Sequence, residues 1–87
     1  MAWRGSAWLR TGRVSAIGEV RKAIGANVRL FRKRAGFSQE ELAEKADLHP
    51  VYISQVERGE KAVSVEALWK ICKALHISMA AVFRGVR

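Results

Sequence analysis

The sequence predicts an all-α domain of five helices. Apolar residues recur at spacings of three and four over several segments, which is the period of an amphipathic helix. Ser38, Ser64 and Ser78 stand directly before such segments, where a hydroxyl group can cap the first turn. No segment alternates between apolar and polar residues as a half-buried strand does. A chain of 87 residues with 49% hydrophobic residues can build one modest core but not two.

The first helix is expected to begin near Val20 and to end before Gly36, which suits a C-terminal cap. The opposite face of this helix is basic and by default remains solvated. Its inner face carries a stripe at spacings of four and three, formed by Val20, Ile24, Val28, Phe31 and Ala35. Its outer face carries Arg21, Lys22, Arg29, Lys33 and Arg34.

A second helix is expected from Ser38 to about Ala46. Ser38 and Glu41 have the spacing of a capping box, in which each side chain accepts a hydrogen bond from the backbone N–H of the other residue. Leu42 and Ala46 form its inner face. Asp47 follows where the chain must turn, because aspartate tolerates a left-handed backbone better than most residues.

A third helix follows after only a short turn. His49 is placed as its N-cap and Pro50 at its first position, where the missing N–H has no cost. The helix runs to about Arg58, and Gly59 ends it. Ile53 and Val56 face inward. The residues left facing outward are Pro50, Val51, Ser54, Gln55 and Arg58, with Tyr52 at the margin.

Two further helices complete the predicted domain. Ser64 caps the fourth and Ser78 caps the short fifth. Trp69 stands about one residue off the buried stripe of the fourth helix and is expected to be partly exposed. The stripe itself consists of Leu68, Ile71, Cys72 and Leu75, and the fifth helix carries Met79, Val82 and Phe83.

The composition limits the classes of function. Sixteen basic against eight acidic residues give a net charge of +8, which suggests a polyanionic partner, either nucleic acid or an anionic membrane surface. Cys72 is the only cysteine, so it reads as a core residue without a disulfide. No metal-ligand spacing, catalytic pair or phosphate loop is visible, so neither an enzyme nor a cofactor or small-molecule ligand is expected. Without a long apolar run, the chain is expected to be a soluble cytoplasmic protein.

The segment from Met1 to Gly18 is set apart by arginines and two tryptophans without any acidic residue. Three interpretations remain open: a basic arm that lies along DNA, an organellar transit peptide, or a translated leader without a role. Residues 19–87 are expected to form the folded domain.

Two short helices held at a steep angle by a tight turn make a helix-turn-helix. Within "FSQEELAEKADLHPVYISQVERG", the positions at which this motif needs apolar or small groups hold Leu42, Ala43, Ala46, Leu48, Ile53 and Val56. From Ile24 to Phe83 the chain resembles the Cro/C1-type, or XRE, family of transcriptional regulators, through "SQEELAEKA", "YISQVERGEK", "LWKICKAL" and "ISMAAVF". The resemblance implies a five-helix, lambda-repressor-like domain that binds an inverted-repeat operator in double-stranded DNA as a homodimer.

The resemblance also implies roles for individual residues. Pro50, Val51, Ser54 and Gln55 would face base edges in the major groove. Contacts to phosphates would come from Gln39, His49, Tyr52, Arg58, Lys61, Lys33 and Arg34. Arg32 and Glu57 would form an internal ion pair, and Trp69, Met79, Val82 and Phe83 would form the dimer interface.

Three positions depart from the family pattern. Asp47 stands where glycine is common, and His49 where serine or threonine is common. Pro50 replaces a long polar base reader, so direct readout would depend largely on Gln55 pairing with adenine and on apolar contact with a thymine methyl group.

The expected function is therefore that of a transcriptional regulator, either a repressor or a restriction-modification controller protein. An antitoxin-type module that binds a protein as well as DNA is the alternative. Binding of a membrane surface through the Trp- and Arg-containing leader is a third possibility.

Overall fold

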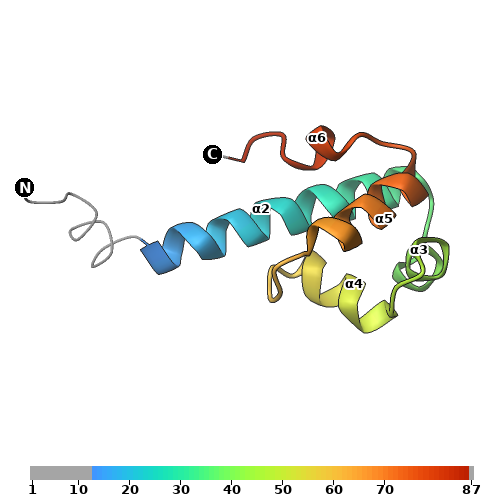
Figure 1. The fold of residues 1–87 in the computed structure, drawn as a ribbon, viewed down its shortest axis with the longest axis horizontal. Helices are drawn as coiled ribbons and strands as arrows, with labels where there is room; N and C mark the ends of the chain where they lie inside the picture. The colour runs from blue at the N-terminus through green and yellow to red at the C-terminus, as the bar shows by residue number, and fades with distance from the viewer. Residues whose placement is uncertain (1–12, 87) are drawn as a thin grey trace, which may run out of the picture.

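The computed structural model describes the backbone of residues 13–86 and the side chains from residue 16 onward. This part of the chain contains helices and no strands, which confirms the predicted all-α class of five helices. The helices are α2 (Arg13–Arg34), α3 (Gln39–Ala46), α4 (Pro50–Glu57), α5 (Val65–Leu75) and α6 (Met79–Val82). The four shorter helices gather around the C-terminal half of α2, as Figure 1 shows.

The long helix α2 begins earlier than the sequence pattern indicated. It starts at Arg13 rather than near Val20, so the expected boundary at Gly18 falls inside the helix. The interpretations offered for Met1 to Gly18 concern mainly residues 1–12, which lie outside the described residues. At its other end α2 stops at Arg34, and Gly36 adopts a left-handed backbone with φ of 77°. Ala35 lies beyond the helix and is exposed, so its placement on the buried stripe was wrong.

The core lies where α2, α3, α4, α5 and α6 meet. Of the six motif positions that require apolar or small groups, Leu48 is half-buried and packs against the core, and the other five are buried. Cys72 is 2% exposed, as expected for a core residue. Full burial of one Leu or Ile side chain stabilises the fold by about 1.5–3 kcal/mol. The largest fully buried side chains are Leu42, Ile53, Ile71, Val28, Val56 and Val82.

Helix α4 crosses α2 at Gly25. A Cβ atom at this position would lie 2.2 Å from the carbonyl oxygen of Val56 and 2.6 Å from that of Glu57. Only glycine permits so close an approach of a helix to the backbone of another element. The position of α4 on the long helix therefore depends on the absence of a side chain at residue 25.

The predicted caps are present. The Ser38 hydroxyl accepts from the N–H of Glu41, and the Glu41 carboxylate accepts from the N–H of Ser38, which completes the capping box. Ser64 and Ser78 accept from the N–H groups of Ala67 and Ala81. Each such cap contributes about 1 kcal/mol to helix stability. The sequence therefore specified where these helices begin.

The C-terminal turn is fastened to α2 by Asn27. Its amide nitrogen donates to the carbonyl oxygens of Val82 and Arg84, at 2.6 Å and 3.0 Å. Val82 is fully buried in the core of the single chain. Its assignment to a dimer interface was therefore wrong. In a helix of four residues the sequence pattern does not show which apolar side chain faces the core.

Candidate nucleic-acid interface

The turn between α3 and α4 is rigidly built. Asp47 adopts a left-handed backbone with φ of 55°, and the N–H of Leu48 donates to the carbonyl oxygen of Ala43 at 2.8 Å. Leu48 then packs its side chain against the core. Aspartate thus supplies the backbone geometry that glycine commonly supplies in this motif, and α4 is held at a fixed angle to α3.

A buried ion pair fixes the C-terminal end of α4 to α2. The Arg32 guanidinium donates through Nε to Glu57 Oε2 at 2.6 Å and through Nη2 to Glu57 Oε1 at 3.0 Å. Its Nη1 donates to the carbonyl oxygen of Phe37 at 2.8 Å. Both residues are at most 9% exposed. Because every charged group has partners, the desolvation of this pair is compensated by strong hydrogen bonds.

Gln39 extends this network toward the surface. Its side-chain nitrogen donates to Glu57 Oε1 at 3.1 Å, which links the first residue of α3 to the last residue of α4. An amide nitrogen carries two hydrogen atoms, so one remains available for another acceptor. The Gln39 amide thus holds α4 in place and keeps one N–H for another acceptor at the edge of the motif.

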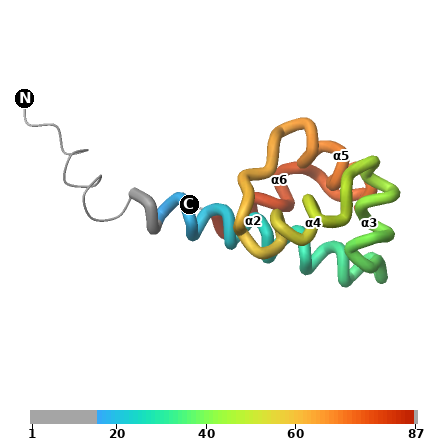
Figure 2. The backbone as a smooth tube through the Cα atoms, turned by 90° about the horizontal axis from the view of Figure 1, so that it is seen from below, coloured from blue at the N-terminus to red at the C-terminus, as the bar shows by residue number. Residues whose placement is uncertain are grey.

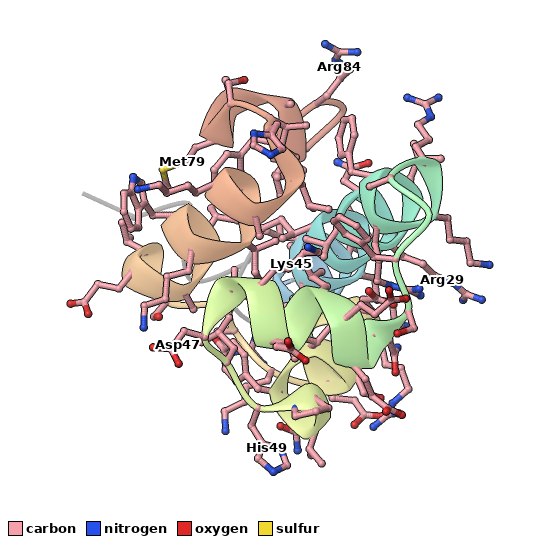
Figure 3. The ribbon with its side chains drawn as sticks, turned by 90° about the vertical axis from the view of Figure 1, so that its right-hand side faces the viewer. Arg29, Lys45, Asp47, His49, Met79 and Arg84 are labelled. Carbon is pink, nitrogen blue, oxygen red and sulfur yellow. The ribbon has the colours of Figure 1, made fainter. Side chains whose placement is uncertain are left out.

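The outer surface of α4 carries the four residues expected to face bases. Val51 is 54% exposed, whereas Pro50, Ser54 and Gln55 are half-buried. Figure 3 shows α4 at one extremity of the molecule, below α3, with His49 at its projecting end. This surface of α4 is therefore accessible from outside the molecule, most of all at Val51.

His49 caps α4 through its ring. Its Nδ1 accepts from the N–H of Val51 at 3.1 Å, so Nδ1 carries no proton in this arrangement. The neutral ring then carries its proton on Nε2, which is a donor. In Figure 3 the imidazole points away from the body of the molecule. His49 thus serves as the N-cap predicted from sequence and leaves a donor beyond the helix end.

A basic group and a hydroxyl group lie close together where α4 faces the segment that follows it. Lys61 places its ammonium group 5.8 Å from the centre of the Tyr52 ring. The Tyr52 hydroxyl accepts from the N–H of Ser64 at 3.2 Å, which ties α4 to the start of α5 and leaves the hydroxyl proton free. This region therefore presents several donors next to the exposed end of the motif.

Arg58 is engaged by its neighbours in a way that the sequence reading missed. Its Nε and Nη2 donate to the two carboxylate oxygens of Glu60, at 2.8 Å and 3.0 Å, and its Nη1 donates to the Ser54 hydroxyl. The hydrogen bond from Arg58 lowers the pKa of Glu60 and in turn raises the pKa of Arg58. The sequence signal for this ion pair was the placement of opposite charges two positions apart, at Arg58 and Glu60. The hydrogen bond from Arg58 joins the Ser54 hydroxyl on α4 to the residue that ends the helix, and the ion pair with Glu60 holds Arg58 in that position.

Lys33 and Arg34 are exposed at the C-terminal end of α2. Arg34 places its guanidinium 5.8 Å from the centre of the Phe31 ring. Among the described residues, no hydrogen bond or ion pair engages either cation. They stand on the same helix as Arg32 but, unlike it, face solvent.

A separate apolar surface lies on α5 and α6. Trp69 is 52% exposed, with the Lys73 ammonium group 4.7 Å from its ring centre. Val65 and Phe83 are also exposed, and Met79 is half-buried. Val65, Trp69 and Met79 line one shallow hollow on this surface.

Comparison with known proteins identifies the family. The family model described as helix-turn-helix, HTH_3, matches residues 28–82, which include the whole of α3, α4 and α5. The chain belongs to this helix-turn-helix family. It is a DNA-binding transcriptional regulator of the Cro/C1, or XRE, type and not an enzyme.

Individual relatives agree with this assignment. The control protein C.BamHI of Bacillus amyloliquefaciens is 44% identical over 59 residues, which cover 67% of this chain and 73% of the relative. The crystal structure of the clp gene regulator ClgR from C. glutamicum matches with a TM-score of 0.71 and 45% identity, covering 75% of this chain and 84% of that one. The restriction-modification controller protein C.AhdI from Aeromonas hydrophila matches with a TM-score of 0.71 and 35% identity, covering 72% and 96%. The resemblance inferred from sequence is therefore confirmed.

In the part of the chain that the structure describes, no helix combines the length and the apolar character that a membrane span requires.

Proposed function

We propose that the chain binds an inverted-repeat operator as a homodimer and places α4 of each subunit in the major groove of one half-site. The observation that carries the proposal is the rigid presentation of α4. The N-terminal end of this helix projects from the molecule, while its C-terminal end is fixed by the Arg32–Glu57 pair. A recognition helix must hold its side chains in one register to discriminate between bases. The buried ion pair and the close approach at Gly25 supply that rigidity.

Base readout is assigned to the outer surface of α4. The Gln55 amide can donate to and accept from adenine, and Val51 with Pro50 can contact a thymine methyl group. Ser54 offers a hydroxyl group that is held beside Arg58. A good bidentate pair provides about 1–3 kcal/mol of discrimination. With so few readers, specificity of this chain would also draw on the shape of the operator.

Phosphate contacts are assigned to the donors that surround α4. Gln39 retains one free amide hydrogen, Tyr52 a free hydroxyl proton, and His49 an outward Nε2–H. Arg58 would exchange Glu60 for a phosphate, which can accept in the same bidentate geometry. Lys61, Lys33 and Arg34 would add charge along the backbone of the duplex.

The homodimer is proposed to form through α5 and α6. Trp69, Met79 and Phe83 expose apolar surface there, and Val65 extends it. A self-complementary apolar patch is what a two-fold interface requires. Val82 stays in the core of each subunit and takes no part.

The names of similar proteins suggest the kind of regulation that this chain carries out. Several of them are named as control proteins or restriction-modification controller proteins. We propose by analogy that this chain controls a small operon in the cytoplasm.

A selection for bound sequences from random duplex DNA tests this function. The proposal predicts an inverted repeat with half-sites about one helical turn apart and a preference of at least about a thousandfold over scrambled DNA. Titration at two salt concentrations separates base readout from simple charge attraction. Binding that ignores sequence and disappears with salt would contradict the proposal and direct the search to a protein partner.

A further inference from the structure

The Ser54 hydroxyl on the outer surface of α4 accepts a hydrogen bond from a charged neighbour. Arg58 follows about one helical turn later, and its Nη1 donates to Ser54 Oγ. A hydroxyl group has one hydrogen atom to donate and two lone pairs that accept. Among the described residues, the hydroxyl hydrogen of Ser54 has no hydrogen-bond acceptor. The contact with Arg58 therefore occupies one lone pair and leaves this hydrogen free.

The turn that ends α4 holds Arg58 in this position. Gly59 has φ of 71°, and its N–H donates to the carbonyl oxygen of Val56 at 3.0 Å. The N–H of Glu60 donates to the carbonyl oxygen of Gln55 at 2.9 Å. These two bonds form a Schellman cap, which brings Glu60 back to the end of α4. There its carboxylate accepts from Nε and Nη2 of Arg58. Beyond the cap the chain continues as a loop to α5, as Figure 2 shows.

The positive charge of Arg58 limits what the Ser54 hydroxyl can bind next. A serine without such a neighbour can donate to one base edge or accept from another, so it reads either kind. Here a second N–H donor would have to approach the Ser54 oxygen beside a guanidinium, which repels it. Hydrogen bonds in a chain also polarise one another, so the bond that Ser54 accepts strengthens the bond that it donates. The hydroxyl is thus prepared to act as a donor.

The free groups of Arg58 have the same character. A guanidinium carries five N–H groups, and here two bind Glu60 and one binds Ser54. The others can only donate. In the major groove guanine offers two acceptors, N7 and O6, whereas adenine and thymine offer one acceptor each and cytosine offers only a donor. The surface that Ser54 and Arg58 form therefore fits guanine best and cytosine worst.

We propose that Ser54 reads a guanine in each half-site as a hydrogen-bond donor, and that Arg58 is the positioning residue that fixes the hydroxyl in this role. The proposal rests on the proposed placement of α4 in the major groove. It is compatible with the exchange of Glu60 for a phosphate. The phosphate would take Nε and Nη2 of Arg58, while Nη1 would stay on Ser54.

Two selections from random duplex DNA test the proposal, one with the parent protein and one with Ser54→Ala. The parent should select an inverted repeat with a guanine in each half-site, and Ser54→Ala should select the same repeat without a preference at that position. In titrations, replacing this G·C pair by C·G should weaken binding of the parent about tenfold, as expected for the loss of a hydrogen bond. Ser54→Ala should bind both duplexes alike.

Arg58→Ala separates positioning of Ser54 from contact with a phosphate. This variant should bind both duplexes more weakly and should also lose most of the preference for G·C over C·G. Titration at low salt keeps its binding measurable. The control is Lys61→Ala, which should weaken binding to both duplexes and retain the preference. A preference that survives in Arg58→Ala would show that Arg58 does not set the role of Ser54.

Two results of the selections would overturn the proposal. One is a base other than guanine at the position where Ser54→Ala loses its preference. The other is a Ser54→Ala selection identical to that of the parent. Both leave the proposed function intact, because the parent would still recognise an inverted repeat. Binding by the parent that ignores sequence would instead contradict the placement of α4 in the groove, and this proposal with it.

Discussion

The carboxylate of Glu57 is held by the guanidinium of Arg32 in a buried, bidentate ion pair with contacts of 2.6 Å and 3.0 Å. This pair joins the last residue of α4 to the long helix that carries the rest of the core. Gln39 adds a third contact from the start of α3. The orientation of the proposed recognition helix is thus set by polar contacts at its base as well as by apolar packing of Ile53 and Val56.

Removing one partner of this pair should destabilise the fold strongly. Glu57→Ala leaves a buried guanidinium without its countercharge, which costs about 3–5 kcal/mol. Urea denaturation measures the change in the free energy of unfolding. The control is Glu60→Ala, which breaks the exposed pair with Arg58 and should leave the urea midpoint nearly unchanged. Equal effects of the two variants would show that burial of the Arg32–Glu57 pair has no energetic importance.

The crossing of α2 and α4 should be intolerant of any side chain at residue 25. Gly25→Ala forces a methyl group against the carbonyl oxygen of Val56 and should destabilise the fold by about 1–3 kcal/mol or more. Gly18→Ala, in the same helix with nothing near its Cβ, should instead stabilise by about 0.5–1 kcal/mol. Thermal melts of both variants decide the matter. A stabilised Gly25→Ala protein would mean that the two helices do not approach as closely as described.

Stability should fall in acid partly through Glu41. Hydrogen bonds from the backbone and side chain of Ser38 hold the pKa of the Glu41 carboxyl below its usual value of 4.5. A lowered pKa in the folded state contributes stability that is present above the unfolded pKa and is lost as pH falls through the folded pKa. Denaturation midpoints between about pH 5 and about pH 3 should therefore fall less in Glu41→Gln than in the parent protein.

The control for that comparison is Glu44→Gln, which makes the same charge change on α3 outside the capping box. It should retain the acid sensitivity of the parent protein. A Glu41→Gln profile that parallels those of the parent and control would argue that the capping box does not couple to pH.

Local signals in the sequence predicted much of this structure. Ser38 with Glu41, His49 with Pro50, and Ser64 placed the helix starts, because capping depends on residues that are neighbours in the chain. The motif spacing then placed Leu42, Ile53 and Val56 in the core.

Other features depend on contacts between distant residues. The start of α2 at Arg13 was missed because arginines and tryptophans without any acidic residue suggested a separate segment up to Gly18, although Ile17 continues the apolar stripe. Gly25 has no visible role until α4 is placed against it, and Val82 has no assigned side until Asn27 fixes the C-terminal turn. Helical periodicity shows which face of a helix is apolar, but it does not show which other helix packs against that face.

The most direct test of the proposed major-groove readout compares the binding of two proteins, the parent and Gln55→Ala, to two operators. One is the selected operator, and in the other the adenine assigned to Gln55 is replaced. The account predicts that Gln55→Ala loses about 1–3 kcal/mol on the selected operator and that both proteins bind the altered operator alike. Lys61→Ala, as the control for a phosphate contact, should weaken binding to both operators equally and reduce its salt dependence. If Gln55→Ala weakened binding equally on both operators, α4 would not read this base, and the proposed placement of α4 in the major groove would be contradicted.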